Sequence, residues 1–317
     1  MPVLYLTEEQ VRQVLTMEMA IEAVEAGLRK MALEEAFNIP RSRCQTDHTI
    51  LHVLSAAAKS LGVIGYKAYT TTKAAARFHV TIYDAKSGEM SALMQADHLG
   101  QVRTGAASAV ATKCLSRPES KHLGIYGSGK QARTQVLAVC KVRKIEKITA
   151  YSPTEANLKA FVEDLQKEGL PIVAATQPEQ AALGQDIICT ATKSRTPVLK
   201  GEWIAPGTHL NIVGSNFLGK SEIDLEVIKK TNVLVIDSKE QGRIEAGDFA
   251  EALDTKLIAW SDIHELGRVV TGRLPGRESP TEITLFKSLG IGLEDIVVAQ
   301  KILLRAREMN IGTTLDL

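Results

Sequence analysis

Apolar and polar residues follow two different patterns along the chain, and the change comes near residues 116–120. At the start of the first part, residues 7–36 repeat apolar positions at helical spacing, which predicts helix. Thr7 and Gln10 have the spacing of a capping box at the beginning of that helix.

Short runs rich in β-branched and aromatic residues then predict strands. They are residues 49–56, 62–69 and 78–95, and the last is interrupted by a turn at residues 86–88 that predicts a hairpin. The first part therefore has the pattern of an α+β domain.

Beyond Pro118, apolar strands alternate with amphipathic helices. The predicted strands are residues 122–127, 147–152, 186–192, 209–215, 233–238 and 257–263. Strands separated by helical stretches such as residues 130–142 and 154–169 indicate βαβ units and a parallel sheet covered on both faces.

The C-terminal segment predicts a long amphipathic helix after Gly290, which could pack back on the first part. We therefore expect an α/β protein with a Rossmann doubly wound parallel sheet over residues 117–297. A discontinuous α+β domain would comprise residues 1–116 and about 298–317.

Composition limits the partners that the protein could have. The 317 residues contain 38 Lys and Arg against 37 Asp and Glu, so no net charge favours nucleic acid or an anionic membrane. We expect neither a signal peptide nor a membrane span. The four cysteines lack metal-ligand spacing, which predicts no metal site and reduced thiols in a cytoplasmic protein.

The segment GIYGSGKQA, residues 124–132, matches two phosphate-binding templates. A nucleotide P-loop needs a hydroxyl residue after its lysine to hold magnesium, and Gln131 stands there instead. In a dinucleotide site, Gly127 makes the tight turn, Gly129 lets the backbone approach the pyrophosphate, and Ala132 lets helix and strand pack closely. The strand before and the helix after favour the dinucleotide site.

The end of the second predicted strand bears on the choice of cofactor. An acidic residue there would bind the adenosine ribose of NAD. Ser152, Pro153 and Thr154 occupy the position, and the first acid is Glu155. The cofactor is thus predicted to be NAD(P)H, with NADP mildly favoured over NAD through the two hydroxyls.

Basic residues in the first part are candidates for binding a substrate anion. Lys67 stands in an apolar and aromatic strand, Arg103 begins an Ala-rich helix, and Arg41 and Arg43 precede a strand. Two guanidinium groups and an ammonium could clamp a small carboxylate, and a semi-buried lysine has a lowered pKa that suits proton transfer. His52 is a further candidate.

His98 is also a candidate, although Asp97, His98 and Arg103 could equally form a local hydrogen-bonded cluster.

Several motifs together make the sequence resemble the ornithine cyclodeaminase/mu-crystallin family nearly from end to end. They are the Pro-x-x-Arg segment ending at Arg43, GYKAYT, RTGAASAVATKCL, GIYGSGKQA, CTATKSRTPVL, GSNFLGKSEID and TLFKSLGIGLED. The resemblance implies a homodimer formed through the first domain and a Rossmann domain that binds NAD(H) or NADP(H).

The resemblance also implies site residues. Arg43, Lys67 and Arg103 would hold the substrate carboxylate, with Arg41 as the rival to Arg43, and His52 and Asn216 would border the substrate. The implied cofactor-binding residues are Gly127, Ser128, Gly129, Gln131, Ala132, Ser152, Thr154, Thr190, Ala191, Thr192, Val213, Gly214 and Ser215.

Two positions depart from the members that cyclise ornithine. Asn216 stands where the members that cyclise ornithine or oxidise alanine have an acid/base Asp, and an amide cannot take up a proton at neutral pH. His52 stands where the members that cyclise ornithine have a Glu. Reduction of a C=N bond needs less acid/base chemistry, so we expect an NAD(P)H-dependent reductase of imino acids, of the ketimine, pyrroline-2-carboxylate or iminosuccinate type. The alternatives are an ornithine cyclodeaminase, an amino-acid dehydrogenase, and a non-catalytic binding protein of the mu-crystallin type.

Overall fold

The computed structural model describes residues 3–316, which form two compact units. Unit 1 comprises Met1–Ala107 and Gly290–Leu317, and unit 2 comprises Ser108–Leu289. The sequence-based boundaries, 117 and about 298, lie further along the chain than this division. The second of them would fall inside a helix, because α10 runs over Gly292–Met309 without a break.

Unit 1 is built on a mixed sheet with the strand order β16-β1-β7-β6-β5-β4-β2, and β3 pairs with β4. The strands are β1 (Val3–Leu6), β2 (Ala36–Asn38), β3 (Ser42–Gln45), β4 (Ile50–Ala58), β5 (Val63–Thr71), β6 (Ala76–Asp84), β7 (Met90–Gln95) and β16 (Thr313–Leu315). The predicted hairpin joins β6 and β7, which pair antiparallel, with Gly88 in the left-handed region at φ 76°.

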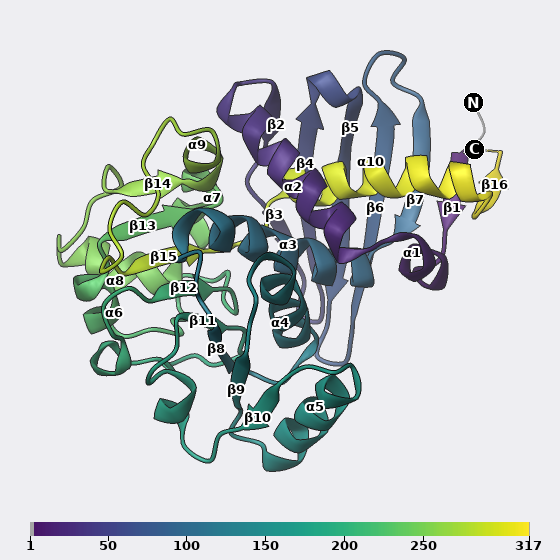
Figure 1. Ribbon diagram of the computed structural model, residues 1–317. Helices are drawn as coiled ribbons and strands as arrows, with labels where there is room; N and C mark the ends of the chain where they lie inside the picture. The colour runs from purple at the N-terminus through teal and green to yellow at the C-terminus, as the bar shows by residue number, and fades with distance from the viewer. Residues whose placement is uncertain (1–2, 317) are drawn as a thin grey trace. The chain divides into compact units, whose positions relative to one another are not determined.

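The helices of unit 1 cover its sheet on the side of α10, which crosses β4, β5 and β6 and packs beside α2 (Figure 1). The other helices are α1 (Glu8–Val14), α2 (Met17–Ala32) and α3 (Asp97–Leu115), whose C-terminal half is counted with unit 2. Residues Ile296, Val297, Ile302 and Leu303 of α10 are fully or almost fully buried. The predicted C-terminal helix is thus confirmed as part of the core of unit 1.

Unit 2 contains an all-parallel sheet with the order β10-β9-β8-β11-β12-β15-β13-β14. Its strands are β8 (His122–Tyr126), β9 (Lys147–Tyr151), β10 (Ile172–Ala174), β11 (Ile187–Thr190), β12 (His209–Ile212), β13 (Val233–Ile236), β14 (Ile263–Glu265) and β15 (Thr284–Lys287). The order reverses between β8 and β11, which is the switch point of a Rossmann sheet. The predicted fold class is confirmed.

Helices flank this sheet, and two apolar clusters form the core of the unit. The helices are α4 (Lys130–Val142), α5 (Glu155–Lys167), α6 (Leu225–Lys230), α7 (Lys239–Glu245), α8 (Gly247–Asp254) and α9 (Leu266–Val270). One cluster lies under α4 and α5 and includes Val136 and Phe161, and the other includes Leu210 and Phe249. Among residues 3–316, no helix combines the length and hydrophobicity needed to cross a bilayer.

Two predictions of elements were wrong in extent. Residues 7–36 do not form one helix, because Leu15 is extended and the Thr16 side chain accepts a hydrogen bond from the backbone N–H of Met19, which starts α2. The predicted strand 257–263 is mostly turn, and only its last residue, Ile263, belongs to β14.

Candidate active site and cofactor site

Lys67 lies in the middle of β5 and is 3% exposed. Its side chain leaves the sheet on the side covered by α10, where Nζ donates a hydrogen bond of 3.0 Å to Oδ1 of Asp295. Asp295 is in the first turn of α10 and is fully buried. The strand and the helix therefore meet through a buried ion pair.

Arg103, on α3, binds the same carboxylate. Its Nε lies 2.9 Å from Asp295 Oδ1, and its Nη1 lies 3.0 Å from Oε2 of Glu294. An Nε and a terminal nitrogen on neighbouring acids give the guanidinium a fixed orientation. Buried charges of this kind are held by such pairing, since an unpaired charge would be costly to bury.

Arg41 joins this group through Gly290. Arg41 is 5% exposed, and its Nη2 donates to the carbonyl oxygen of Gly290 at 2.8 Å. Gly290 has a φ of 72°, and a Cβ there would lie 2.3 Å from Nη1 of Arg103. Only a glycine leaves room for the Arg103 guanidinium group at this position. We call Arg41, Lys67, Arg103, Glu294 and Asp295 the Lys67 cluster.

Arg43 is half-buried and lies opposite His52 in the pairing of β3 with β4. The charge of Arg43 acts on His52, whereas the charge of Arg41 acts on both His52 and Lys67. The structure thus places Arg41 within the Lys67 cluster and Arg43 beside His52.

Burial sets the protonation behaviour of the cluster. It lowers the pKa of Lys67 to about 8, and the nearby positive charges of Arg103 and Arg41 act in the same direction, while Asp295 opposes them. Burial alone would raise the pKa of Asp295, but Arg103 and Lys67 outweigh it and hold the pKa below its usual value. Lys67 is therefore a cation that can release a proton near neutral pH.

Three aromatic rings form a stack beside Lys67. His52, Tyr69 and Phe78 are direct neighbours on β4, β5 and β6. The rings of His52 and Tyr69 are parallel with centroids 4.2 Å apart, and those of Tyr69 and Phe78 are 4.9 Å apart. Lys67 Nζ lies 5.7 Å from the Tyr69 centroid and 5.4 Å from the Phe78 centroid. A flat aromatic wall, formed by these three rings, thus borders the ammonium group.

His52 is neutral in this environment. Burial lowers its pKa to about 4, and Arg43 and Arg41 contribute further. Its Nε2 is 3.0 Å from the Thr71 hydroxyl, and its buried Nδ1 has no hydrogen-bond partner among the described residues.

His98 belongs to a separate group at the start of α3. Its Nδ1 lies 3.0 Å from Nη1 of Arg12, and Glu8 accepts hydrogen bonds from the backbone N–H groups of Asp97 and His98. This is a helix-start arrangement with residues of α1, whereas Arg103 of the expected local cluster binds Glu294 and Asp295.

The Gly-rich loop of unit 2 connects β8 to α4. Gly127 has a φ of 111°, and a Cβ there would lie 2.5 Å from the carbonyl oxygen of Ala191, so the turn requires glycine. Gly129 is the N-cap of α4, and the space where its Cβ would stand is open. Ala132 is fully buried between helix and strand, whereas Gln131 is half-buried. The exposed N-terminus of α4 fits a dinucleotide pyrophosphate.

The end of β9 is linked to this loop. The hydroxyl of Ser128 donates to that of Ser152 at 3.0 Å. Thr154 is the exposed N-cap of α5, and its side chain makes no capping hydrogen bond. Both predicted hydroxyl residues therefore lie at the carboxyl end of the sheet.

The remaining predicted cofactor residues end or follow β11 and β12 at the same end of the sheet. They are Thr190, the last residue of β11, with Ala191 and Thr192 after it, and Val213, Gly214 and Ser215 after β12. Asn216 comes next and is half-buried. Unit 2 thus gathers the predicted cofactor residues, while unit 1 holds Arg43, His52, Lys67 and Arg103.

Sequence reasoning missed the acids that organise these groups, Glu294, Asp295 and Glu222. The signal was present, because Glu294 and Asp295 are adjacent acids in an otherwise apolar helix start, and helical periodicity shows that such residues face the core. Glu222 is also fully buried.

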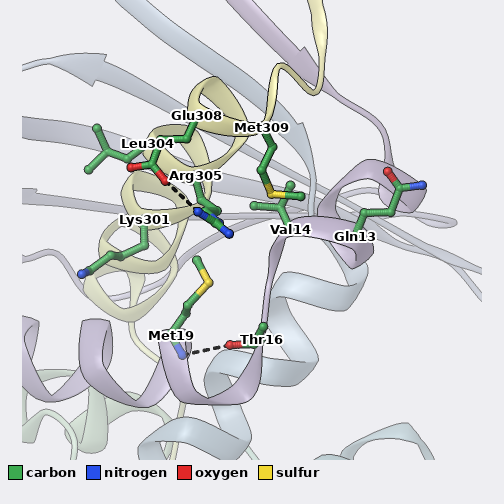
Figure 2. A pocket seen from close by; sticks show the side chains of 9 residues that line it. All are labelled: Gln13, Val14, Thr16, Met19, Lys301, Leu304, Arg305, Glu308 and Met309. Carbon is green, nitrogen blue, oxygen red and sulfur yellow. Dashed lines mark hydrogen bonds and ion pairs between the residues drawn. The ribbon is translucent and has the colours of Figure 1, made fainter.

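A separate groove of unit 1 lies between α1, α2 and the C-terminal half of α10 (Figure 2). Met19, Leu304 and Met309 give it an apolar character, and Arg305 pairs with Glu308 at its edge. None of the predicted site residues lines it.

Comparison with known proteins places these features in context. Residues 3–310 match the model of the ornithine cyclodeaminase/mu-crystallin family. A Delta(1)-pyrroline-2-carboxylate reductase of Bacillus cereus is 33% identical over 99% of this chain and 99% of its own.

Two solved structures are similar over nearly their whole length. The Thermococcus litoralis Delta(1)-pyrroline-2-carboxylate reductase, in complex with NADH and L-proline, is 33% identical with a TM-score of 0.94, covering 99% of this chain and 100% of that one. An archaeal alanine dehydrogenase, a dimer with bound NAD, is 32% identical with a TM-score of 0.94, covering 100% of both chains.

Proposed function

The chain belongs to the ornithine cyclodeaminase/mu-crystallin family, and from that premise we propose that it reduces imino acids to amino acids with a nicotinamide cofactor. As a member of this family it is an NAD(P)-dependent oxidoreductase acting on carbon–nitrogen substrates. The observation that carries the finer proposal is the buried Lys67 cluster, in which a lysine with a pKa of about 8 stands beside a flat aromatic wall.

The charge of the cluster suits one substrate carboxylate. Counted with both acids ionised, Arg41, Lys67 and Arg103 exceed Glu294 and Asp295 by one positive charge. Asp295 accepts one of the three hydrogen bonds that Lys67 can donate. We propose Arg43, Lys67 and Arg103 as the carboxylate ligands, with the buried Arg41 as the rival to Arg43.

The proposed reaction needs one proton and one hydride. When bound, the reduced nicotinamide supplies the hydride to the imine carbon. Lys67 donates a proton from Nζ to the imine nitrogen, which turns the C=N group into a better electrophile. As the hydride adds to carbon, the π electrons move to nitrogen, and the product is the amine. Lys67, left neutral, regains its proton from water.

Asn216 and His52 support reduction over ornithine cyclisation. An amide cannot take up a proton at neutral pH, and a neutral histidine with a pKa of about 4 lacks the negative charge of a carboxylate. We propose that Asn216 orients the substrate by hydrogen bonding and that His52, with Tyr69 and Phe78, borders its carbon skeleton.

The cofactor residues of unit 2 fit a dinucleotide, because Gly127 allows the tight turn and Gly129 leaves the backbone of the α4 N-terminus accessible. The predicted preference for NADP rests on Ser152 and Thr154 and on the lack of an acid before Glu155. The two related structures contain NADH and NAD and give that preference no support. We propose NADH as the cofactor to test first, with NADPH in parallel.

An amino-acid dehydrogenase is the second candidate, because the archaeal relative is an alanine dehydrogenase. The two activities share the hydride step and differ in the source of the imine. A dehydrogenase forms it from a 2-oxo acid and ammonia, whereas the proposed reductase accepts the imine ready-made.

The test follows NADH and NADPH absorbance with Δ1-pyrroline-2-carboxylate, a six-membered cyclic ketimine, iminosuccinate, and pyruvate with ammonia, while ornithine is tested for ammonia release. We expect oxidation of the cofactor with at least one imine. Activity only with pyruvate and ammonia would favour the dehydrogenase, and ammonia from ornithine would favour the cyclodeaminase. If the protein binds cofactor but turns over nothing, it is a binding protein and the proposal is wrong.

Lys67→Ala tests the proposed acid. We expect imine reduction to fall by at least about a hundredfold, in line with the usual contribution of a general acid. Binding of the cofactor should stay unchanged. Lys73→Ala, at an exposed position of the same unit, is the matched control. If Lys67→Ala keeps turnover within about tenfold, roughly 1.4 kcal/mol in barrier, Lys67 is not the acid.

A further inference from the structure

Glu222 lies in the segment between β12 and α6 and is fully buried. Its Oε1 accepts hydrogen bonds from the backbone N–H and the hydroxyl of Thr192, both at 2.7 Å. Its Oε2 accepts from the Thr190 hydroxyl at 2.7 Å and from the Gly214 N–H at 2.6 Å. One carboxylate thus binds the ends of two neighbouring strands.

These bonds extend beyond the sheet itself. The pairing of β11 with β12 ends at Thr190 opposite Ile212. Thr192 and Gly214 therefore belong to the loops that leave the sheet, and Glu222 joins the two loops. A Cβ on Gly214 would lie 2.3 Å from Glu222 Oε1, so the close approach depends on glycine at that position.

A second layer of buried charge holds Glu222 in place. The backbone N–H of Glu222 donates to Oδ1 of Asp248 at 2.6 Å, and Oδ2 of Asp248 lies 2.7 Å from Nζ of Lys287. Lys287 also donates to the carbonyl oxygen of Ser215 at 2.7 Å. The network therefore returns to the loop after β12, and all of its charged members are buried.

The position of these loops indicates what they hold. In a doubly wound sheet, a dinucleotide binds outside the carboxyl ends of the strands at the switch point, with one mononucleotide in each half. β8 and the Gly-rich loop belong to the first half, whereas β11 and β12 lie across the switch point. We propose that Glu222 is a positioning residue for the nicotinamide half of the cofactor, acting through the loops after β11 and β12. The inference rests on the proposed use of a nicotinamide cofactor.

The donors around Glu222 make the site selective for a carboxylate. The Thr192 and Gly214 N–H groups are obligate donors, one on each oxygen, whereas the two threonine hydroxyls can rotate. A glutamine offers one oxygen and one NH₂ group. In Glu222→Gln, the backbone N–H of either Thr192 or Gly214 must therefore face the NH₂ group of the glutamine. That N–H loses its hydrogen bond, and its loop is no longer held by residue 222.

The experiment measures binding by calorimetry to the full-length protein, with NADH and with ADP, which carries adenosine and pyrophosphate but no nicotinamide. For Glu222→Gln we expect the Kd of NADH to rise at least about tenfold, while the Kd of ADP stays within about twofold of the wild-type value. Glu226→Gln, at an exposed position four residues further on, is the matched control and should leave both values unchanged.

An equal rise in the Kd of both ligands would contradict the proposal, because it would indicate a general loss of structure in unit 2. An unchanged Kd for NADH would also contradict it, as would a wild-type protein that does not bind NADH or NADPH. If Glu222→Gln does not fold, Thr190→Val is the substitute variant, because it removes one of the four hydrogen bonds with little change of shape. It should raise the Kd of NADH about threefold and leave the Kd of ADP unchanged. The readout needs no imine, so failure of imine reduction alone leaves this test intact.

Discussion

Asp295 determines how the proposed acid behaves, because its Oδ1 binds both Lys67 and Arg103. Burial and two positive charges lower the pKa of Lys67 to about 8, and Asp295 is the group that raises it. The lysine therefore stays mostly protonated at pH 7, as a proton donor must, and loses its proton as the pH rises above 8. His52, with a pKa of about 4, adds no titration near neutrality.

We predict that the rate of imine reduction falls as the pH rises through about 8, and that Asp295→Asn moves this fall to lower pH. Without the carboxylate, the neutral form of Lys67 is favoured. The pH at which the rate falls should therefore be lower by about one pH unit. The measurement is kcat against pH for both proteins, with Glu308→Gln on the exposed side of the same helix as the control. If the rate of Asp295→Asn falls at the same pH as that of the wild type, or at a higher pH, Lys67 is not the titrating group.

The residues of the site differ in how readily the sequence predicts them. Lys67 and Arg103 could be identified because each basic side chain stands in an apolar segment. The acids that bind them are 191 to 228 residues away along the chain, and a single sequence contains no sign of that contact. Arg41 immediately precedes β3 and Arg43 lies within it, two residues further on, so only the contact of Arg41 with Gly290 distinguishes the buried one.

At the scale of the elements, the loop from β8 to α4 contains two glycines with different requirements. Gly127 needs its positive φ, and a Cβ there would meet the Ala191 carbonyl at 2.5 Å. Gly129 has an ordinary φ of −91° and open space around it. Its proposed role is only to let the pyrophosphate approach the backbone.

We predict that Gly127→Ala lowers the melting temperature, because the loop must distort to accept the side chain. Gly129→Ala should lower the melting temperature of the cofactor-free protein by at most about 3 °C, since no atom surrounds the new methyl group and the change costs only the preference of a helix N-cap for glycine over alanine. It should still weaken NADH binding by at least about tenfold. Differential scanning calorimetry and titration with NADH give the two values. If Gly129→Ala binds NADH as tightly as the wild type does, the pyrophosphate does not bind at this loop.

Elements with a local chemical signal were predicted well. The capping box of Thr7 and Gln10 begins α1, and the glycine turn joins β6 to β7. The break between α1 and α2 was missed because Thr16 reads equally as a residue within a helix, and only its bond to Met19 marks it as a cap. The place of β15 between β12 and β13 depends on contacts distant in sequence, which periodicity does not reveal.

For the whole molecule, the sequence predicted two units because its pattern of strands and helices changes, and it predicted a discontinuous first unit from the C-terminal amphipathic helix. The division at Gly290, immediately before α10, agrees with a helix that returns to the first sheet. The boundary within α3 could not be read from the pattern, because a helix that continues across a division keeps its periodicity.

We propose that the molecule is a homodimer, as the archaeal alanine dehydrogenase is. Each chain has a mass of 34.4 kDa. Sedimentation equilibrium at micromolar concentration should therefore give twice that mass, with or without NADH. A mass of one chain across the concentration range would contradict the prediction.

The central claim is that hydride passes from the cofactor to an imine carbon, and isotope transfer tests it most directly. The protein is supplied with NADH deuterated at both C4 positions of the nicotinamide and with Δ1-pyrroline-2-carboxylate, and the product is analysed by mass spectrometry. The account predicts proline with one deuterium on its α-carbon. With ordinary NADH in D₂O, it predicts proline with no deuterium on that carbon. Proline without cofactor deuterium, or no amino-acid product from this or any other imine of the panel, would contradict it.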